Sequence, residues 1–429
     1  MDDISKTDPE IFDMIKKEGI RIREGVELIP SENFVSKAVL QAYATFFTNK
    51  YSEGYPGRRY YGGNQFVDVV ETLAIERAKK LFGAEHVNVQ PYSGSPANHA
   101  VFFALLNLGD TFMGFDLSAG GHLTHGSPVN FSGKHYKCVP YNVDKETELL
   151  DYDQIMKLAK ETKPRLILSG LTAYPRKIDF KAFKEICDEV EAYHFADIAH
   201  IAGLCATGVH QNPVPYCDVV TTTTHKTLRG PRGAIIMCKI EDRLDKEGKK
   251  NLAQKIDSAV FPGLQGGPHN HVNAAKAVAF KEALKPEYKK YCEQIVKNAK
   301  ALADSLMDNG LELVTGGTDN HLMVIKLVNK GLTGKGKEIQ NALSEAEIYV
   351  NKNTIPYEPN TPFNPSGIRL GTPAITTRGM EESEMKFIGE CIAKVIDNYT
   401  DKNVIEKVKK DILELCKEFP LYQEFDVLK

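Results

Sequence analysis

The chain has 429 residues, of which 42% are hydrophobic and 26% charged, a balance typical of globular domains that bury a sizeable core. Its net charge of -3 argues against a nucleic-acid-binding protein and against a protein held on an anionic membrane. The eight cysteines include no C-x-x-C pair, so we expect free thiols and no zinc site, as in a cytoplasmic protein. The start of the chain is polar, which argues against a signal peptide, and no apolar run reaches the ~20 residues of a membrane span.

In chain order, residues 1–50 carry helical pieces but no strong strand pattern, and we expect them to form an N-terminal arm. Apolar residues recur at helical spacing over 65–82, which predicts an amphipathic helix. Strand and helix patterns then alternate, which predicts a mostly parallel sheet between helices. The expected strands are 111–115, 165–169, 195–198, 217–224 and 233–239, and the expected helices are 96–107, 151–161 and 179–193.

Farther along, the glycine- and proline-rich segment 261–268 predicts a loop, followed by a long helix from about residue 272. We place a domain boundary inside that helix, which gives an arm at 1–50, a large domain at 51–281 and a small α/β domain at 282–429. Residues 331–337 match the start of a P-loop, but Glu338 stands where a Mg²⁺-binding hydroxyl should follow. We therefore interpret this segment as the entry to a helix and not as a nucleotide site.

The run 219–227, Val-Val-Thr-Thr-Thr-Thr-His-Lys-Thr, is the most informative stretch of the chain. Its β-branched residues predict a strand that ends at His225 and Lys226. A lysine just past a strand end is a candidate Schiff-base nucleophile. A single lysine there is more often only solvated, so the assignment depends on its neighbours.

Two other motifs supply such neighbours. Ser93, Gly94 and Ser95 precede a predicted helix, and the amides, hydroxyls and dipole at such a helix start can bind a phosphate, although a plain N-cap is the alternative. Asp197 ends a short apolar strand, where a carboxylate needs a cationic partner, such as the protonated ring nitrogen of pyridoxal phosphate (PLP). The alternative is that Asp197 caps a helix or forms a buried ion pair. With Lys226 on the aldehyde, these residues would form a complete PLP site.

Three further motifs carry candidate functional side chains. Arg369 lies between apolar residues flanked by glycines, a setting that suits either bidentate capture of a carboxylate or a surface salt bridge. Glu53 lies among aromatic and turn residues, where it is either a proton-transfer group or a solvated loop carboxylate. His122 and His125 lack a third ligand at metal-site spacing, so we expect no metal and interpret His122 as a ring that stacks on a planar cofactor.

Together these residues resemble the serine hydroxymethyltransferases, a family of PLP fold type I with an aspartate-aminotransferase-like architecture. Residues 219–233 form one matching segment, and within it residues 221–227, together with 120–126, are far more specific than a lone PLP-lysine pattern. The other matching segments are 28–34, 49–63, 88–98, 120–128, 197–203, 261–268, 349–354 and 366–372. The resemblance implies a large domain with a mostly parallel seven-stranded sheet between helices, an N-terminal arm and a smaller C-terminal α/β domain.

The resemblance also implies site residues. Lys226 would hold PLP as an aldimine, Asp197 would pair with the pyridinium, and His122 would stack on the ring. The other implied cofactor-binding residues are Ser93, Gly94, Ser95, Thr172, His200 and Thr223, with Tyr51, Gly266 and Gly267 from a second subunit. The implied catalytic residues are Lys226, Glu53, His225 and Tyr61, and the implied serine-binding residues are Ser31, Tyr61, His200 and Arg369. The implied folate-binding residues are Glu53, Leu117, Gly121, His122, Leu123, Asn353, Thr361, Pro362 and Phe363.

The implied reaction is reversible transfer of the serine hydroxymethyl carbon to tetrahydrofolate, giving glycine and 5,10-methylenetetrahydrofolate, as part of one-carbon metabolism and glycine biosynthesis. The implied partners are serine or glycine, a reduced folate and a second copy of the chain in a homodimer or tetramer with shared active sites. The alternative is a folate-independent PLP aldolase acting on β-hydroxy amino acids. A cofactor-free binding protein on this fold is a further alternative, against which the joint presence of Lys226, Asp197 and Arg369 argues.

Three positions depart from the family pattern. Pro30 stands where alanine is usual, Thr172 replaces a serine expected to contact the cofactor, and Leu264 enlarges a loop position that varies in the family. None of these changes removes a catalytic group, but the extra methyl of Thr172 bears on fine cofactor geometry.

Overall fold

The computed structural model describes residues 2–423, and the chain divides into two compact units. The larger unit comprises residues 33–293, and the smaller unit joins the chain before residue 33 to the chain after residue 293. This division differs from the predicted boundaries at 50/51 and 281/282. Helix α3 (Lys37–Tyr43) belongs to the larger unit because Val39 packs with Ala275 and Ala279 of helix α11 (Asn270–Ala283).

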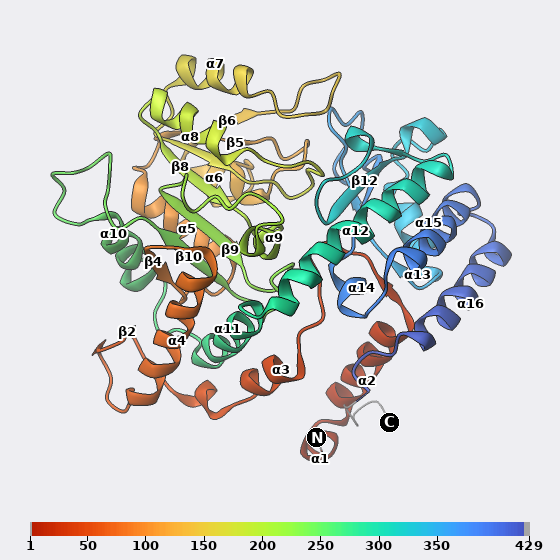
Figure 1. The fold of residues 1–429 in the computed structure, drawn as a ribbon, viewed down its shortest axis with the longest axis horizontal. Coiled ribbons are helices and arrows are strands. Elements are labelled where there is room, and N and C mark those ends of the chain that lie inside the picture. Colours follow the sequence, from red (N-terminus) through yellow and green to blue (C-terminus); the bar gives the residue numbers. More distant parts are fainter. Residues whose placement is uncertain (1, 424–429) are drawn as a thin grey trace. The chain divides into compact units, whose positions relative to one another are not determined.

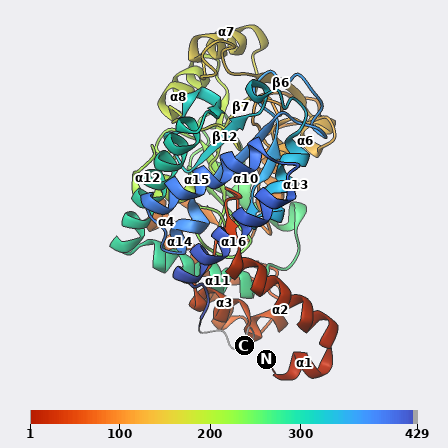
Figure 2. The same ribbon diagram turned by 90° about the vertical axis from the view of Figure 1, so that its right-hand side faces the viewer.

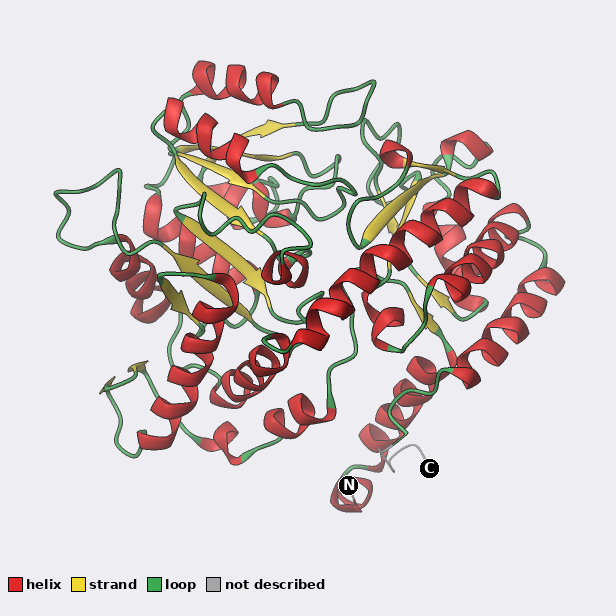
Figure 3. Cartoon of the chain, viewed as in Figure 1, coloured by secondary structure: helices red, strands yellow, loops and turns green. Residues whose placement is uncertain are grey.

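Seven strands form the sheet of the larger unit, in the order β4-β10-β9-β8-β7-β5-β6 (Figures 1 and 3). Strands β5 to β9 pair in parallel, while β10 is antiparallel to both of its neighbours, which confirms the predicted mostly parallel seven-stranded α/β fold. The strand bounds are β4 His86–Asn88, β5 Thr111–Phe115, β6 Lys137–Tyr141, β7 Leu166–Ser169, β8 Tyr193–Asp197, β9 Val219–Thr223 and β10 Ala234–Cys238.

Helices cover both faces of this sheet. Apolar side chains of α5 and α10 form one core cluster with Tyr193 and Phe195 of β8. The opposite face carries α8, whose Phe183 contacts the rings of Tyr141 and His194. This alternation follows from the pleat, which points successive strand residues to opposite faces. The helices of the unit, besides α3 and α11, are α4 Gln65–Phe82, α5 Gly94–Leu105, α6 Phe131–His135, α7 Tyr152–Thr162, α8 Phe180–Glu189, α9 Ala202–Thr207 and α10 Leu252–Ser258.

The predicted elements differ from the observed ones mainly at their ends. Helix α8 stops at Glu189 instead of Tyr193, because Glu191 adopts a left-handed φ of 53° and Tyr193 already begins β8. The long helix expected from residue 272 is two helices, α11 and α12 (Pro286–Asp308). Pro286 suits the first turn of a new helix because it has no N–H to contribute to the preceding one.

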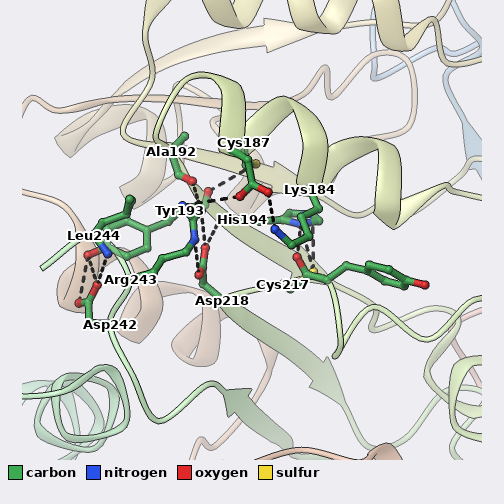
Figure 4. Close-up of polar contacts among 12 residues, drawn as sticks. Lys184, Cys187, Ala192, Tyr193, His194, Cys217, Asp218, Asp242, Arg243 and Leu244 are labelled. Atoms are coloured by element: carbon green, nitrogen blue, oxygen red, sulfur yellow. Dashed lines mark hydrogen bonds and ion pairs between the residues drawn. The ribbon is translucent and has the colours of Figure 1, made fainter. Parts of the chain in front are cut away.

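A polar network fixes the amino ends of β8 and β9 (Figure 4). Arg243 donates from Nε and Nη2 to the two carboxylate oxygens of Asp218, at 2.8 and 2.9 Å, and from Nη2 to the carbonyl of Ala192. Asp218 Oδ2 also accepts the backbone N–H of His194 at 2.8 Å. The opposite, carboxyl ends of the strands are where open α/β sheets bind ligands.

The smaller unit is built on an antiparallel sheet of order β11-β12-β15-β14 and a parallel pair of β1 with β13. Helix α2 lies beside α16, an amphipathic helix (Figure 2). Arg378 joins them by donating to the backbone carbonyls of Gly25, Cys416 and Phe419 at 2.8, 3.0 and 2.6 Å. The strands are β1 Val26–Glu27, β11 Glu312–Leu313, β12 Leu322–Lys326, β13 Ile348–Tyr349, β14 Asn351–Asn353 and β15 Gly367–Gly371. The helices are α1 Asp2–Thr7, α2 Pro9–Glu24, α13 Gly336–Glu345, α14 Pro373–Thr377, α15 Glu382–Asp397 and α16 Lys402–Glu418.

Helix α13 begins at Gly336, so the P-loop-like segment 331–337 is a helix entry, as predicted. In the described part of the chain, none of the helices combines the length and apolar character needed to cross a membrane.

Candidate active site

Asp197 is the last residue of β8 and lies at the carboxyl end of the sheet. Its Oδ2 accepts hydrogen bonds from Asn98 Nδ2 at 2.7 Å and from His125 Nε2 at 3.2 Å, and its Oδ1 accepts the Ala199 N–H at 3.0 Å. Burial alone would raise the pKa of Asp197, but the hydrogen bonds from His125 and Asn98 hold it well below its usual range. The side chain is therefore an ionised carboxylate, and these bonds fill three of its roughly four acceptor positions.

His122 is oriented by the same network. Asn98 Nδ2 also donates to Thr124 Oγ1 at 2.8 Å, and Thr124 Oγ1 lies 2.8 Å from His122 Nδ1. The backbone N–H of Thr124 donates to the same Nδ1 at 3.2 Å. Because an amide can only donate, Nδ1 is unprotonated and the neutral ring carries its proton on Nε2. The ring is thus fixed in one orientation and one tautomer by residues that are themselves connected to Asp197.

Ser93, Gly94 and Ser95 form the start of α5, with Ser93 as the residue that precedes the helix. The Ser93 side chain makes no capping hydrogen bond, which leaves its hydroxyl for other partners. A Cβ on Gly94 would lie 2.9 Å from the Thr223 Cγ2 methyl, so no larger residue fits there without a shift. The helix dipole, the first amides and this tight glycine form a cradle suited to a phosphate.

Lys226 and His225 follow β9, the neighbour of β8 in the sheet. Lys226 is buried, and its carbonyl accepts a hydrogen bond from Asn33 Nδ2 at 2.9 Å. Burial, reinforced by the charges of Lys226 and Arg232, lowers the pKa of His225 to about 3, so its imidazole is neutral. Within residues 2–423, His225 Nδ1 is a buried atom that has no hydrogen-bond partner.

The segment that follows β5 carries four residues predicted to bind folate, Leu117, Gly121, His122 and Leu123. A Cβ on Gly121 would lie 2.2 Å from the carbonyl oxygen of Phe115, so this position requires glycine. Leu117 and Leu123 are apolar side chains that are nevertheless exposed on this unit.

Two other predicted cofactor residues lie on loops at the same end of the sheet. Thr172 follows β7, and its N–H donates to the carbonyl of Gly120 at 2.8 Å. His200 follows β8, is buried, and accepts a bond on its carbonyl from Thr227 Oγ1 at 3.0 Å. The structure therefore gathers the residues predicted around Asp197 at one sheet edge.

A second cluster is formed by Tyr51, Glu53, Tyr61, Gly266 and Gly267. Tyr51 donates from its hydroxyl to Glu53 Oε1 at 3.1 Å, and its ring meets that of Tyr61 edge-on at 5.0 Å. A Cβ on Gly266 would lie 3.2 Å from Glu53 Oε1, and a Cβ on Gly267 would lie 3.2 Å from the Tyr51 ring. These five residues, predicted to serve one site together, are neighbours in the larger unit.

The backbone around Glu53 is anchored by Arg59. Its Nη1 donates to the carbonyls on either side of Glu53, those of Ser52 at 2.9 Å and Gly54 at 2.7 Å. The guanidinium also donates from Nη2 to the buried Glu71 of α4 at 2.7 Å. Glu53 directly precedes β2 (Gly54–Tyr55), and Arg59 ties the backbone on both of its sides to α4.

The smaller unit carries the remaining predicted site residues. Arg369 is buried in β15, donates from Nε to Asn351 Oδ1 at 3.1 Å, and has its pKa lowered to about 10 by burial. The segment that carries Ser31 packs on the same strand, because a Cβ on Gly371 would lie only 2.6 Å from Pro30 Cβ. Asn353 ends β14, the edge neighbour of β15, and 361–363 follow it in an exposed loop.

The residues at the carboxyl edge of the larger sheet fit PLP. The ionised carboxylate of Asp197 suits the ring nitrogen of PLP, and the start of α5, where Gly94 leaves no room for a Cβ, suits the phosphate. The buried Nδ1 of His225, which has no hydrogen-bond partner in the described residues, suits a polar group near the aldehyde. The sequence reasoning did not assign roles to Asn98 and His125, although both lie inside motifs it quoted. In the described residues, no group of three or more His, Cys, Asp or Glu side chains is arranged to hold a metal.

The comparison with protein families agrees with this geometry. A family model described as serine hydroxymethyltransferase matches residues 4–392 of the 429-residue chain. Since the match covers most of the chain, the protein belongs to the serine hydroxymethyltransferase family, whose members are PLP-dependent transferases.

Proposed function

We propose that the protein transfers the hydroxymethyl carbon of serine reversibly to tetrahydrofolate, forming glycine and 5,10-methylenetetrahydrofolate. The observation that carries this proposal is the arrangement at one sheet edge of ionised Asp197, the Ser93–Ser95 cradle and the buried Lys226. The eight free cysteines are consistent with a reducing compartment such as the cytoplasm.

In this proposal the larger unit holds PLP through several groups. The fourth acceptor position of Asp197 would receive the protonated ring nitrogen, the cradle would bind the phosphate, and Lys226 Nζ would bond to the aldehyde carbon. His122, fixed by Thr124, would lie against the ring face. When bound, PLP supplies an electron sink for the negative charge that develops at the α-carbon of the amino acid.

The amino-acid substrate would be oriented by its carboxylate. The buried guanidinium of Arg369 is a planar donor that suits bidentate binding of a carboxylate. Ser31 lies on the segment that packs against the same strand, and its hydroxyl would add a further hydrogen bond. Burial makes the charge of Arg369 costly without an anionic ligand, which supports a role in substrate binding.

Proton movement would fall to Glu53, with the Tyr61 hydroxyl nearby. Arg59 fixes the backbone of Glu53, so its carboxylate can be held at a defined position while its protonation state changes. The low pKa of His225 means that its ring is neutral and only weakly basic, so it takes up a proton poorly. His225 would therefore act beside Lys226 as a neutral hydrogen-bonding group, not as a general acid or base.

Folate would be recognised by apolar surface and by an amide. Leu117 and Leu123 expose side chains on the larger unit, and Phe363 is 80% exposed on the smaller one. Such apolar side chains suit the flat pterin and the benzoyl ring, while Asn353 would contribute hydrogen bonds to ring heteroatoms. These groups support the folate-dependent reaction over an aldolase that needs no pterin.

We further propose a homodimer with shared active sites. Helix α4 exposes Phe66, Val69 and Leu73 at helical spacing, with Phe66 70% and Val69 57% exposed. Arg59 forms ion pairs with Asp68 and Glu71 of α4 and also binds the backbone on both sides of Glu53, so Glu53 is held at a fixed position relative to this apolar face. A large exposed apolar face is typical of an interface, and in a two-fold dimer it would carry Glu53 into the partner's site.

The experiment that tests the proposal is an absorbance scan of the purified protein alone, with glycine, with tetrahydrofolate and with both. We expect a visible band from bound PLP and a new, longer-wavelength band that is strong only when both ligands are present. A spectrum that responds to glycine but is indifferent to folate would favour the folate-independent aldolase. A protein that shows no visible band after incubation with PLP would contradict the enzyme assignment.

A further inference from the structure

Lys276 of α11 is a fully buried lysine outside the residues assigned above, with a side chain that is only 1% exposed. Its Nζ donates to the backbone carbonyls of Val89, Ala234 and Pro91, at 2.5, 3.0 and 3.3 Å, and lies 3.3 Å from Asn273 Oδ1. Every one of these partners is an oxygen acceptor. Three N–H donors facing four acceptors is the arrangement that suits an ammonium group.

The first segment that Lys276 holds is residues 89–92, which lead directly into the Ser93–Ser95 cradle. This segment lies after β4 and before α5, and one backbone hydrogen bond, from the Ala234 N–H to the carbonyl of Pro91 at 3.3 Å, joins it to β10. Side chains add further contacts: Lys276 binds the carbonyls of Val89 and Pro91, and Gln265 binds the carbonyl of Gln90 at 2.9 Å and the N–H of Tyr92 at 3.1 Å.

The second segment that Lys276 holds follows Lys226 in the chain. The carbonyl of Ala234 begins β10, and a Cβ on Gly233 would lie 2.6 Å from Lys276 Cε, so the backbone passes directly against this side chain. The carbonyl of Gly233 accepts the N–H of Thr224, two residues before Lys226, at 3.0 Å. Lys276 thus joins the backbone before the phosphate cradle to the backbone after the Schiff-base lysine.

We propose that Lys276 is a positioning residue that fixes the phosphate cradle relative to the end of β9, and so sets the affinity of the site for the phosphate group of PLP. This inference rests on the proposed cofactor role of Ser93–Ser95. Lys276 does not touch the cofactor in this proposal, because its three donors are taken by the backbone carbonyls. Loss of the ammonium removes its hydrogen bonds to the carbonyls of Val89 and Pro91 and so loosens residues 89–92, which the side chain of Gln265 and the Ala234 N–H would then hold without it.

The test compares PLP with pyridoxal, which carries the same aldehyde and ring nitrogen but no phosphate. The full-length chain is freed of cofactor, and the dissociation constants of both compounds are measured by absorbance titration. The variant is Lys276→Met, which keeps an unbranched side chain as far as the Cε position and removes the charge and the donors. The matched control is Lys281→Met, an exposed lysine on the same helix.

We expect Lys276→Met to raise the dissociation constant of PLP at least about tenfold, while that of pyridoxal changes by less than about twofold. Lys281→Met should leave both constants as in the parent chain. If the binding of both compounds weakens equally, Lys276 has a general structural role. If neither dissociation constant changes, Lys276 has no role in the cradle. Either result overturns the inference. Should circular dichroism show that Lys276→Met does not fold, Lys276→Gln, which retains two N–H donors, takes its place with the same criterion.

The affinities of the parent chain for PLP and pyridoxal distinguish failure of this inference from failure of the proposed function. If the parent binds PLP no more tightly than pyridoxal, the Ser93–Ser95 cradle does not recognise a phosphate, and both the cofactor assignment and this inference fail. If the parent prefers PLP strongly and the Lys276 variants keep that preference, only the role of Lys276 is overturned.

Discussion

His125 Nε2 donates to Asp197 Oδ2 at 3.2 Å, while the other ring nitrogen of His125 accepts the backbone N–H of His122 at 3.3 Å. Because the amide can only donate, His125 Nδ1 is unprotonated, and the proton of a neutral ring lies on Nε2, toward Asp197. The negative charge of Asp197 is thus stabilised by hydrogen bonds from His125 and Asn98. It remains available to a cation brought by a ligand.

Lys226→Ala should therefore retain PLP without a covalent bond, since Asp197 and the phosphate cradle are unchanged. We expect the visible band of lysine-bound cofactor to disappear and serine turnover to fall by several orders of magnitude, because the nucleophile is lost. Absorbance and bound phosphate after gel filtration measure both properties. A variant with the parent spectrum and normal turnover would refute the assignment of Lys226.

Arg369→Ala should weaken serine binding at least tenfold. A hydrogen bond to a charged group contributes about 1.5–3 kcal/mol, and about 1.4 kcal/mol corresponds to each factor of ten. PLP affinity should stay at the parent value, because Arg369 would bind the amino acid and not the cofactor. Spectral titration with serine gives the affinity, and Arg369→Lys is the matched variant that keeps charge but loses the bidentate donor. An unchanged serine affinity in the alanine variant would exclude the role.

Glu53→Gln should abolish most of the transfer of carbon from serine to folate while serine still binds. The substitution keeps the shape of the side chain and its hydrogen bond with Tyr51, and removes only the titrating group. Transfer rates across the pH range provide the measurement, and serine titration provides the control. Parent-like rates throughout that range would show that Glu53 moves no proton in the reaction.

Sequence patterns point to the candidate site residues more readily than to the side chains that contact them. Val219–Thr227 and Ser93–Ser95 are recognisable because the strand pattern and the helix start are local in sequence. Asn98 donates to Asp197, which is 99 positions away, and only the order of the strands and the placement of α5 bring the two together. His125 was considered as a metal ligand, and its contact with Asp197 has no local signal.

Other features carried no sequence signal at all. Three of the four partners of Lys276 are backbone carbonyls, which every residue type supplies, so no residue pattern indicates them. The strand β6 contains Pro140 and was not predicted, because an edge strand tolerates a proline that a central strand would not. The N-terminal segment 1–32 pairs through β1 with β13, a contact between parts of the chain more than 300 residues apart.

Stability should fall with rising pH because of Glu27. This carboxyl is 3% exposed, and burial, together with the charge of Glu32, raises its pKa to about 8 from an ordinary value of 4.5. Between these two values the folded chain binds more protons at Glu27 than the unfolded chain, so unfolding becomes easier as pH rises. Glu27→Gln should therefore gain stability relative to the parent between pH of about 5 and about 8, by at least about 1 kcal/mol.

Urea unfolding at several pH values measures this difference, and Glu10→Gln, at an exposed position of α2, is the matched control. The control should follow the parent at every pH. If the stability difference between Glu27→Gln and the parent does not change with pH, Glu27 does not titrate in this range.

The shared-site dimer predicts that two inactive variants restore activity when combined. Lys226→Ala and Glu53→Gln chains each lack one group, and in a mixed dimer one site carries both lesions. The other site takes Lys226 from the Glu53→Gln chain and Glu53 from the Lys226→Ala chain, and is intact. Random pairing makes about half of the dimers mixed, so about a quarter of all sites, and of the parent activity, should return on co-expression.

The matched control is co-expression of a Lys226→Ala chain with an Asp197→Asn chain, since both residues would contribute to the same site from the same chain. Both residues lie at one sheet edge of one chain, so the mixed dimer of these two variants has no site in which both are intact on the same chain. It should stay inactive, whereas the Lys226→Ala and Glu53→Gln pair recovers. Tagging the two chains differently and purifying the mixed dimer through both tags removes the parent homodimers from the assay. A doubly purified Lys226→Ala and Glu53→Gln dimer as inactive as either variant alone would refute the shared site.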